Sequence, residues 1–201
     1  MIDYITKPEF KILEYLNQMI NITENDKLTE HSIWCLNNLM DEAFPELMGE
    51  VLKTDLMPRI DELIQREKLP MNIARVVSWS LCKLSNAPRT DLGIVQGLME
   101  CISTLLFIND DEAHLDLLLA FVNLTSKDEE TEELTMGKYD IINTFSILPK
   151  VVSIFAGPNK KCSAQALRVI GNVSSLNHKG CEQELLKASI FIKGKFSSIS
   201  Y

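Results

Sequence analysis

Apolar side chains recur along this chain at spacings of three and four residues, and short polar segments interrupt them. Phe10, Leu13, Leu16, Met19 and Ile20 begin the pattern, which places them on one face of a helix over about residues 8 to 22. A second helix is predicted over residues 28 to 40. The same sequence of two helices then returns, with first helices at residues 56 to 67, 97 to 107 and 147 to 156. The pattern therefore predicts an all-α protein built from helix pairs.

One phrase repeats inside the second helix of each pair. It begins at Trp34, Trp79, Leu119 and Arg168, and these lead positions are separated by 45, 40 and 49 residues. A period of about 40 to 47 residues marks stacked repeats of the HEAT and armadillo kinds. Shorter apolar segments at residues 43–51, 94–96 and 136–145 would supply the short first helix of a three-helix unit, which favours armadillo. We expect one armadillo-repeat domain over residues 1–201, with about four repeats in a right-handed superhelix and an incomplete last repeat. The four lead residues should line one concave face.

Composition restricts the partners. The formal charge is −8 and the isoelectric point is near 5.0, which opposes binding to nucleic acid or anionic membranes and favours basic partners. The dense acidic run at residues 127–133 is either a solvated loop or an acidic lip for a basic ligand. No apolar run reaches the length of a membrane span, and the start does not resemble a signal peptide. The five cysteines form no Cys-x-x-Cys pair, so reduced thiols are expected.

Catalytic signatures are missing from the sequence. His31, His114 and His178 lie far apart and match no metal-ligand spacing. His114 is expected to be a solvated residue at a helix start rather than a metal ligand. The sequence contains no nucleophile elbow, phosphate loop or dinucleotide fingerprint. We therefore predict a protein that is not an enzyme and that uses no cofactor and no metal.

Three segments resemble the importin-α family, the adaptors that carry nuclear-localisation signals. Residues 33–39 are similar to the family's third-repeat helix, residues 78–88 to its fourth, and residues 166–173 to its sixth, where the family also replaces tryptophan by arginine. The resemblance extends from about residue 8 to residue 186. It implies a protein of the cytoplasm and nucleus that binds basic segments of cargo proteins, with a second transport factor as a further candidate partner.

In such a groove, an asparagine can bind the peptide backbone, because its amide both donates and accepts hydrogen bonds. A tryptophan one turn earlier attracts a lysine ammonium through its ring. On this sequence the resemblance implies one complete pocket from Trp34, Asn38 and Glu42, with Asp41 beside it. The remaining candidate peptide-binding residues are Trp79, Asn123, Arg168 and Asn172.

Several of these residues have a plainer alternative. Each tryptophan could be a core residue, and Asn123 and Asn172 could be amides that bond helix ends or loops. Arg168 could stack on the groove or pair with an acid between repeats.

Two positions depart from the family pattern. Lys83 stands where the second asparagine of the groove is expected, and Leu119 stands where the third tryptophan is expected. Lys83 cannot accept a hydrogen bond, and it would place a positive charge in a groove meant for lysines. The family's basic amino-terminal tail is expected to be absent. An alternative function is therefore an armadillo scaffold whose peptide groove has degenerated. A stack that stops within a repeat would also leave an apolar flank that needs a cap or a partner.

Overall fold

The computed structural model describes residues 12–21, 25–40, 45–87, 92–126, 132–175 and 178–197, and within these ranges the chain forms eleven α-helices and no strand. The helices are α2 (Ile12–Asn21), α3 (Asp26–Leu39), α4 (Pro45–Leu52), α5 (Leu56–Ile64), α6 (Met71–Leu84), α7 (Leu92–Leu105), α8 (Asp111–Thr125), α9 (Glu132–Phe145), α10 (Leu148–Phe155), α11 (Lys160–Ser174) and α12 (Lys179–Ser197).

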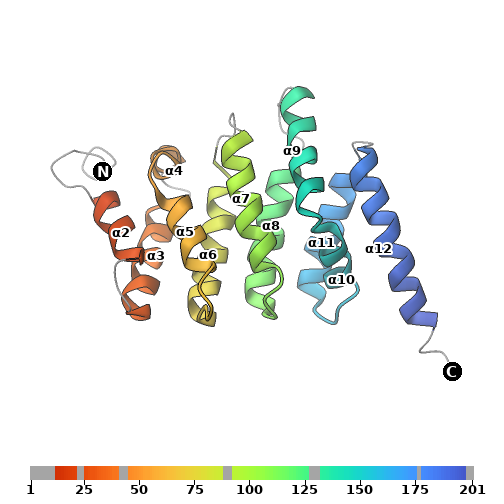
Figure 1. Cartoon of the computed structure of the whole chain (residues 1–201), viewed down its shortest axis with the longest axis horizontal. Helices are drawn as coiled ribbons and strands as arrows, with labels where there is room; N and C mark the ends of the chain where they lie inside the picture. The colour runs from red at the N-terminus through yellow and green to blue at the C-terminus, as the bar shows by residue number, and fades with distance from the viewer. Residues whose placement is uncertain are drawn as a thin grey trace.

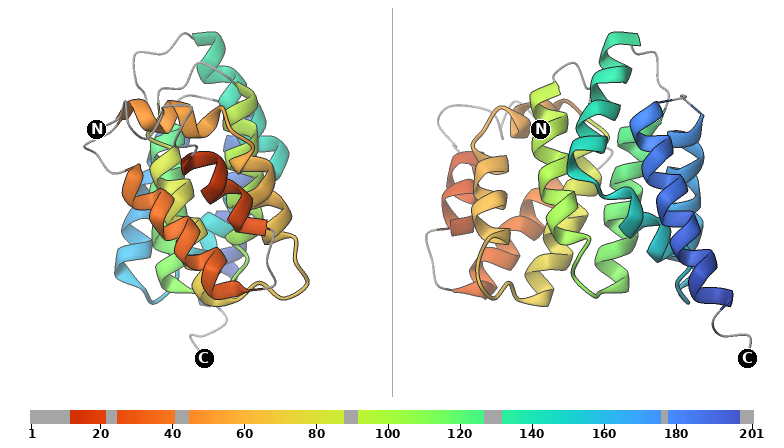
Figure 2. Two further views of the ribbon diagram at one scale, coloured as in Figure 1. Left: turned by 90° about the vertical axis from the view of Figure 1, so that its left-hand side faces the viewer. Right: turned by 45° about the vertical axis from the view of Figure 1, so that its right-hand side comes forward.

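The helices form two layers along a single axis (Figure 1). In one layer α3, α6, α8 and α11 each contact the next, and we call these the ladder helices. They are the helices that carry Trp34, Trp79, Leu119 and Arg168. In the other layer α2 contacts α5, α5 contacts α7, and α7 contacts α9. The end view on the left of Figure 2 looks along the stack, so the successive helix pairs lie behind one another. The pairing of a first helix with a ladder helix is the arrangement that the repeated phrase predicts.

Local sequence explains where the ladder helices begin. The side chain of Asn25 accepts hydrogen bonds from the first backbone N–H groups of α3, Asp110 does so for α8, and Asn159 does so for α11. These short side-chain oxygens satisfy amides that have no partner inside the helix. Pro70 precedes α6 with an extended backbone. After α9, Ser146 takes a positive φ of 50°, which turns the chain into α10.

The predicted helix boundaries need two corrections. Residues 94–96 are not a separate short helix, because they lie inside the continuous helix α7. The chain between Leu92 and Leu105 contains no proline, and helices tolerate single glycines at a cost of about 1 kcal/mol. The helix predicted at residues 56–67 ends at Ile64. Of the first predicted helix, residues 12–21 are helical and residues 8–11 lie outside the described part.

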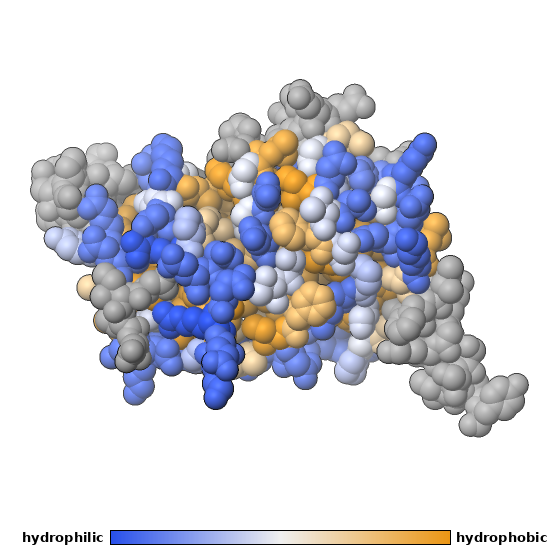
Figure 3. Space-filling view, viewed as in Figure 1, coloured by the Kyte–Doolittle hydropathy of each residue, from blue (hydrophilic) through white to orange (hydrophobic). Residues whose placement is uncertain are grey.

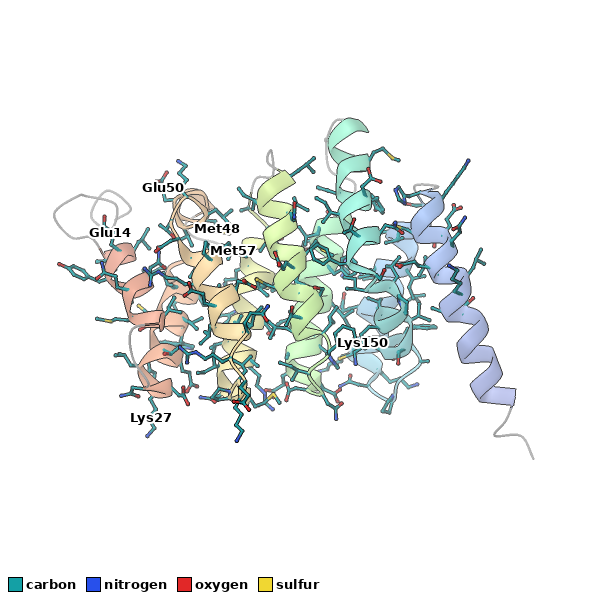
Figure 4. All side chains as sticks on the ribbon, viewed as in Figure 1. Glu14, Lys27, Met48, Glu50, Met57 and Lys150 are labelled. Carbon is teal, nitrogen blue, oxygen red and sulfur yellow. The ribbon has the colours of Figure 1, made fainter. Side chains whose placement is uncertain are left out.

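The hydrophobic core runs between the two layers along the length of the stack. Ile33, Ile60, Leu81, Leu98 and Phe121 are all at most 1% exposed and belong to one continuous cluster. Figure 4 shows side chains filling the space between neighbouring helices. Lys150, labelled there, has its Nζ 5.8 Å from the centroid of the Phe107 ring. On the face seen in Figure 3, apolar side chains reach the surface mainly over the middle of the stack. Each repeat therefore buries its apolar residues against its neighbours, as a solenoid requires.

Candidate peptide-binding site

Both tryptophans lie at one pocket on the ladder helices. We call it the tryptophan pocket. It has a volume of about 400 Å³, and it is lined by Trp34 of α3, by Arg75, Val76 and Trp79 of α6, and by Glu112, Leu115 and Asp116 of α8. Trp34 is 53% exposed and Trp79 is half-buried. Trp34 is therefore a surface residue, and the alternative that places it in the core is wrong.

Arg75 links α6 to the start of α8 beside this pocket. Its Nη2 lies 2.7 Å from Oδ2 of Asp110 and its Nη1 lies 2.7 Å from Oε2 of Glu112. The hydrogen bond from Arg75 lowers the pKa of Asp110 below its ordinary value, because the guanidinium favours the ionised carboxylate. The negative charge of Glu112 thus already has a cationic partner from the protein itself.

Asp116 is the acid that remains for a ligand, and the sequence analysis did not identify it. Burial raises the pKa of its carboxyl to about 6, and the nearby charge of Glu112 raises it further in the same direction. An arriving cation would favour the ionised form and lower that pKa again. The available signal was a charged residue between Leu115 and Leu117, within the part of the helix that is otherwise apolar up to Val122.

The ammonium group of Lys83 lies over the Trp79 ring, where the cation of a basic ligand would otherwise bind. Its Nζ lies 5.3 Å from the centroid of the Trp79 ring, within the range of a cation–π interaction. Cys82 lies beside it, and burial together with the charge of Asp116 raises the pKa of this thiol to about 11, although Lys83 acts in the opposite direction. Cys82 is therefore a neutral thiol at physiological pH and a poor nucleophile or metal ligand.

Two of the predicted asparagines make hydrogen bonds between repeats. Asn123 donates from Nδ2 to Oγ of Ser85 at 2.9 Å, and Asn172 donates from Nδ2 to Oγ1 of Thr125 at 3.1 Å. Both side chains are half-buried. The amide of Asn38 is exposed, and its Nδ2 donates to the Trp34 carbonyl of the same helix at 3.0 Å. Asn38 therefore presents its side chain to solvent one turn after Trp34, while Asn123 and Asn172 hold neighbouring ladder helices together.

The sequence analysis also overlooked Asn37. Its side chain is 0% exposed. It donates from Nδ2 to the Val76 carbonyl at 3.0 Å and accepts from Oγ of Ser80 at 2.7 Å. Asn37 thus joins α3 to α6, whereas its neighbour Asn38 faces outward. Only the packing of α3 against α6 distinguishes the two amides.

Leu119 and Arg168 do not line the tryptophan pocket. Leu119 is half-buried, and Arg168 is exposed with Nη1 donating to Oε1 of Gln165 at 3.0 Å. Asp41 and Glu42 lie outside the described residues, as does the segment 127–131 of the acidic run. The peptide-binding roles of all these residues remain predictions.

His114 is 5% exposed and its Nε2 lies 3.0 Å from the Leu106 carbonyl oxygen. The prediction of a solvated His114 is therefore wrong, because the first turn of α8 packs against the residue that directly follows α7. Within the described ranges, no three His, Cys, Asp or Glu side chains gather as a metal site requires. In the same ranges no helix combines the length and the apolar character needed to cross a membrane.

Solved structures similar to this chain are designed armadillo-repeat proteins. One superposes with a TM-score of 0.70 at 14% identity over 88% of this chain and 70% of its own. A second, in complex with the peptide (KR)4, gives 0.68 at 15% identity with the same coverage of 88% and 70%. A third, designed for modular peptide recognition, gives 0.68 at 13% identity and again 88% and 70%. No protein-family model and no curated protein matches the chain. The predicted armadillo-repeat fold is confirmed.

Proposed function

We propose that this protein is a non-enzymatic adaptor that binds an extended peptide with basic side chains along its ladder helices. The observation that carries the proposal is the tryptophan pocket, in which the exposed ring of Trp34, the ring of Trp79 and the carboxyl of Asp116 line one depression of about 400 Å³. A lysine or arginine side chain needs these two things, an apolar wall for its stem and an acid for its charged end.

The chemistry of each part follows from its position. A ligand cation over the ring of Trp34 would gain roughly 0.5 to 2 kcal/mol from the cation–π interaction. Its charge would meet Asp116, while the exposed amide of Asn38 lies one turn from Trp34 and can bond a peptide backbone. The peptide (KR)4 bound by one of the similar designed proteins is also basic, and this supports the same class of ligand here.

The finer part of the proposal is nuclear import. The similarity of residues 33–39, 78–88 and 166–173 to importin-α supports cargo segments of the nuclear-localisation type as the natural ligands, with the protein acting in the cytoplasm and nucleus. A second transport factor that carries the loaded adaptor belongs to the same proposal.

A degenerate scaffold is the second candidate, and two specific contacts favour it. The ammonium of Lys83 already lies over the Trp79 ring, and Arg75 already neutralises Glu112. Both cations belong to the protein and compete with a basic ligand for the same partners. In that case the repeats serve assembly, and no basic peptide binds at the tryptophan pocket.

Titration of a lysine-rich peptide against the purified protein separates the two candidates. The measurement is made at about 50 mM and about 500 mM NaCl, because added salt screens an electrostatic groove. A glutamate-rich peptide of equal length is the control ligand, and Asp116→Asn is the control variant, since it keeps the shape of the side chain and removes its charge. The adaptor predicts binding that weakens with salt and with Asp116→Asn. Absence of binding to the parent protein at low salt would leave only the scaffold.

A further inference from the structure

A second depression lies at the end of the stack, between α10, α11 and α12. Its volume is about 420 Å³, and it includes the side chains of Phe155, Leu167 and Leu186. These three side chains are 41%, 54% and 62% exposed, which is unusual for large apolar residues that lie together. In the right-hand view of Figure 2, α12 stands at this end of the molecule with α11 beside it. We call this depression the end groove.

The register of the ladder helices explains why the end groove is apolar. On each ladder helix, one stripe is formed by three positions. They are the residue directly before the lead residue, the second residue after it and the sixth residue after it. On α3, α6 and α8, or directly after their last residue, these side chains are at most 1% exposed: Ile33, Leu36 and Met40; Ser78, Leu81 and Ser85; Leu118, Phe121 and Thr125. The same stripe on α11 consists of Leu167, Ile170 and Ser174, which all line the end groove. Of these, Leu167 and Ser174 are exposed and Ile170 is half-buried.

A hydrogen bond that recurs between ladder helices also indicates that α11 can accept a further helix. On α8 and α11 the asparagine four residues after the lead residue donates to the hydroxyl six residues after the lead residue of the preceding ladder helix. Asn123 does so to Ser85, and Asn172 does so to Thr125. The next hydroxyl in this series is Ser174, and it is exposed in the end groove. The acceptor for one more ladder asparagine is therefore present on α11.

We propose that the end groove binds one amphipathic helix of a partner protein, in the place that a fifth ladder helix would take. The face that α11 itself turns to α8 shows what such a helix needs. It carries Cys162, Ala166, Val169 and Val173, all at most 1% exposed, with the donor Asn172 directly before Val173. The partner helix should therefore present small apolar side chains with this spacing, and an asparagine or glutamine that reaches Ser174. The acid Glu182 in the end groove favours a basic residue on the partner helix.

A second copy of this chain fits the end groove poorly. Its helix α3 carries Asn38 at the matching position, but α3 is packed against α2. If α3 entered the end groove, α2 would need the place beside it in the first-helix layer. There α12 already packs against α9 and α10. A helix without an attached first helix avoids this collision.

The ladder sequence of the protein itself supplies a probe. A labelled peptide of residues 160–174, with Cys162→Ala to prevent oxidation, carries the apolar stripe and Asn172. Fluorescence polarisation measures its binding to the full chain at about 500 mM NaCl, where surface electrostatics are screened. A peptide of this length is marginally helical alone, so binding should also raise its helicity.

Three substitutions test the contacts. Leu167→Asp in the protein should weaken binding more than tenfold, while Met71→Asp, which changes an exposed methionine of α6, should leave it unchanged. Ser174→Ala in the protein and Asn172→Ala in the peptide should each weaken binding about threefold to tenfold, and the pair together should cost no more than either alone. Independent, additive losses would contradict the proposed hydrogen bond.

Two results would overturn the proposal as a whole. One is a peptide that does not bind to the parent protein, or that binds equally well to Leu167→Asp. The other is sedimentation showing that the parent protein dimerises and that Leu167→Asp is monomeric, which would assign the end groove to a second copy. Neither result bears on the tryptophan pocket, because lysine-peptide binding there is measured separately.

Discussion

Asn37 and Asn38 are adjacent amides with opposite surroundings, and replacing each by alanine tests the tie between repeats. Asn37 is 0% exposed and makes its two hydrogen bonds to α6, at 3.0 and 2.7 Å. Asn38 is exposed, and within the described part of the chain its side chain bonds only inside its own helix. The two substitutions remove the same atoms from the same helix. The difference between them therefore measures what the contact with α6 contributes.

The magnitude follows from the contacts. A buried hydrogen bond contributes about 1 kcal/mol to the free energy of unfolding. Asn37→Ala loses two such bonds together with the packing of the amide, so we expect the free energy of unfolding to fall by about 2 to 3 kcal/mol. The Val76 carbonyl keeps its bond from Ser80 at 3.0 Å, which limits the penalty. For a chain of this length that loss lowers the midpoint of thermal unfolding by about 4 to 12 °C. Asn38→Ala should change stability by less than about 0.5 kcal/mol, since alanine is a better helix former.

Unfolding of both variants by denaturant, followed by circular dichroism and by tryptophan fluorescence, is the assay. Because repeat proteins can unfold in parts, the fluorescence of Trp34 and Trp79 reports whether α3 separates from α6 first. Equal stability of the two variants would refute the inference that Asn37 joins the repeats.

The remaining predictions concern the tryptophan pocket. Trp34→Ala should weaken the binding of a lysine-rich peptide by about 1 to 2 kcal/mol in isothermal titration, and it should leave the binding of a neutral peptide unchanged. Because Trp34 is 53% exposed, the thermal midpoint should hardly change. Lys83→Asn removes the cation over Trp79 and should increase the affinity for the same peptide about threefold to tenfold. An unchanged affinity would show that Lys83 does not compete with the peptide for the Trp79 ring. Binding should weaken as the pH falls from 7.5 to 5, because the raised pKa of Asp116, about 6, means that its carboxyl gains a proton over this interval. The weakening is at most about tenfold, and it should vanish in Asp116→Asn, which leaves Arg75, Lys83, Cys82 and Glu112 around the site unchanged.

The sequence by itself determined the class of fold. Helical periodicity in the apolar residues and a phrase returning at Trp34, Trp79, Leu119 and Arg168 were enough to predict stacked helix pairs, because each pair buries its apolar stripe only by packing on the next. Local capping residues such as Asn25 and Asn159 also determined where helices begin. These signals act within one helix or between neighbouring repeats, and so they are readable along the chain.

Only the tertiary structure decided which polar side chains face a ligand. Asn37 and Asn38 differ by one position and about 100° around the helix axis, and the packing of α3 on α6 alone makes the first a tie between repeats. Asp116 faces Trp34 and Trp79 because three ladder helices meet there, although these residues are far apart in sequence. The same packing uses the amides of Asn123 and Asn172 between repeats. Side-chain environment in a solenoid depends on the register between helices, and register is a property of the stack rather than of any one segment.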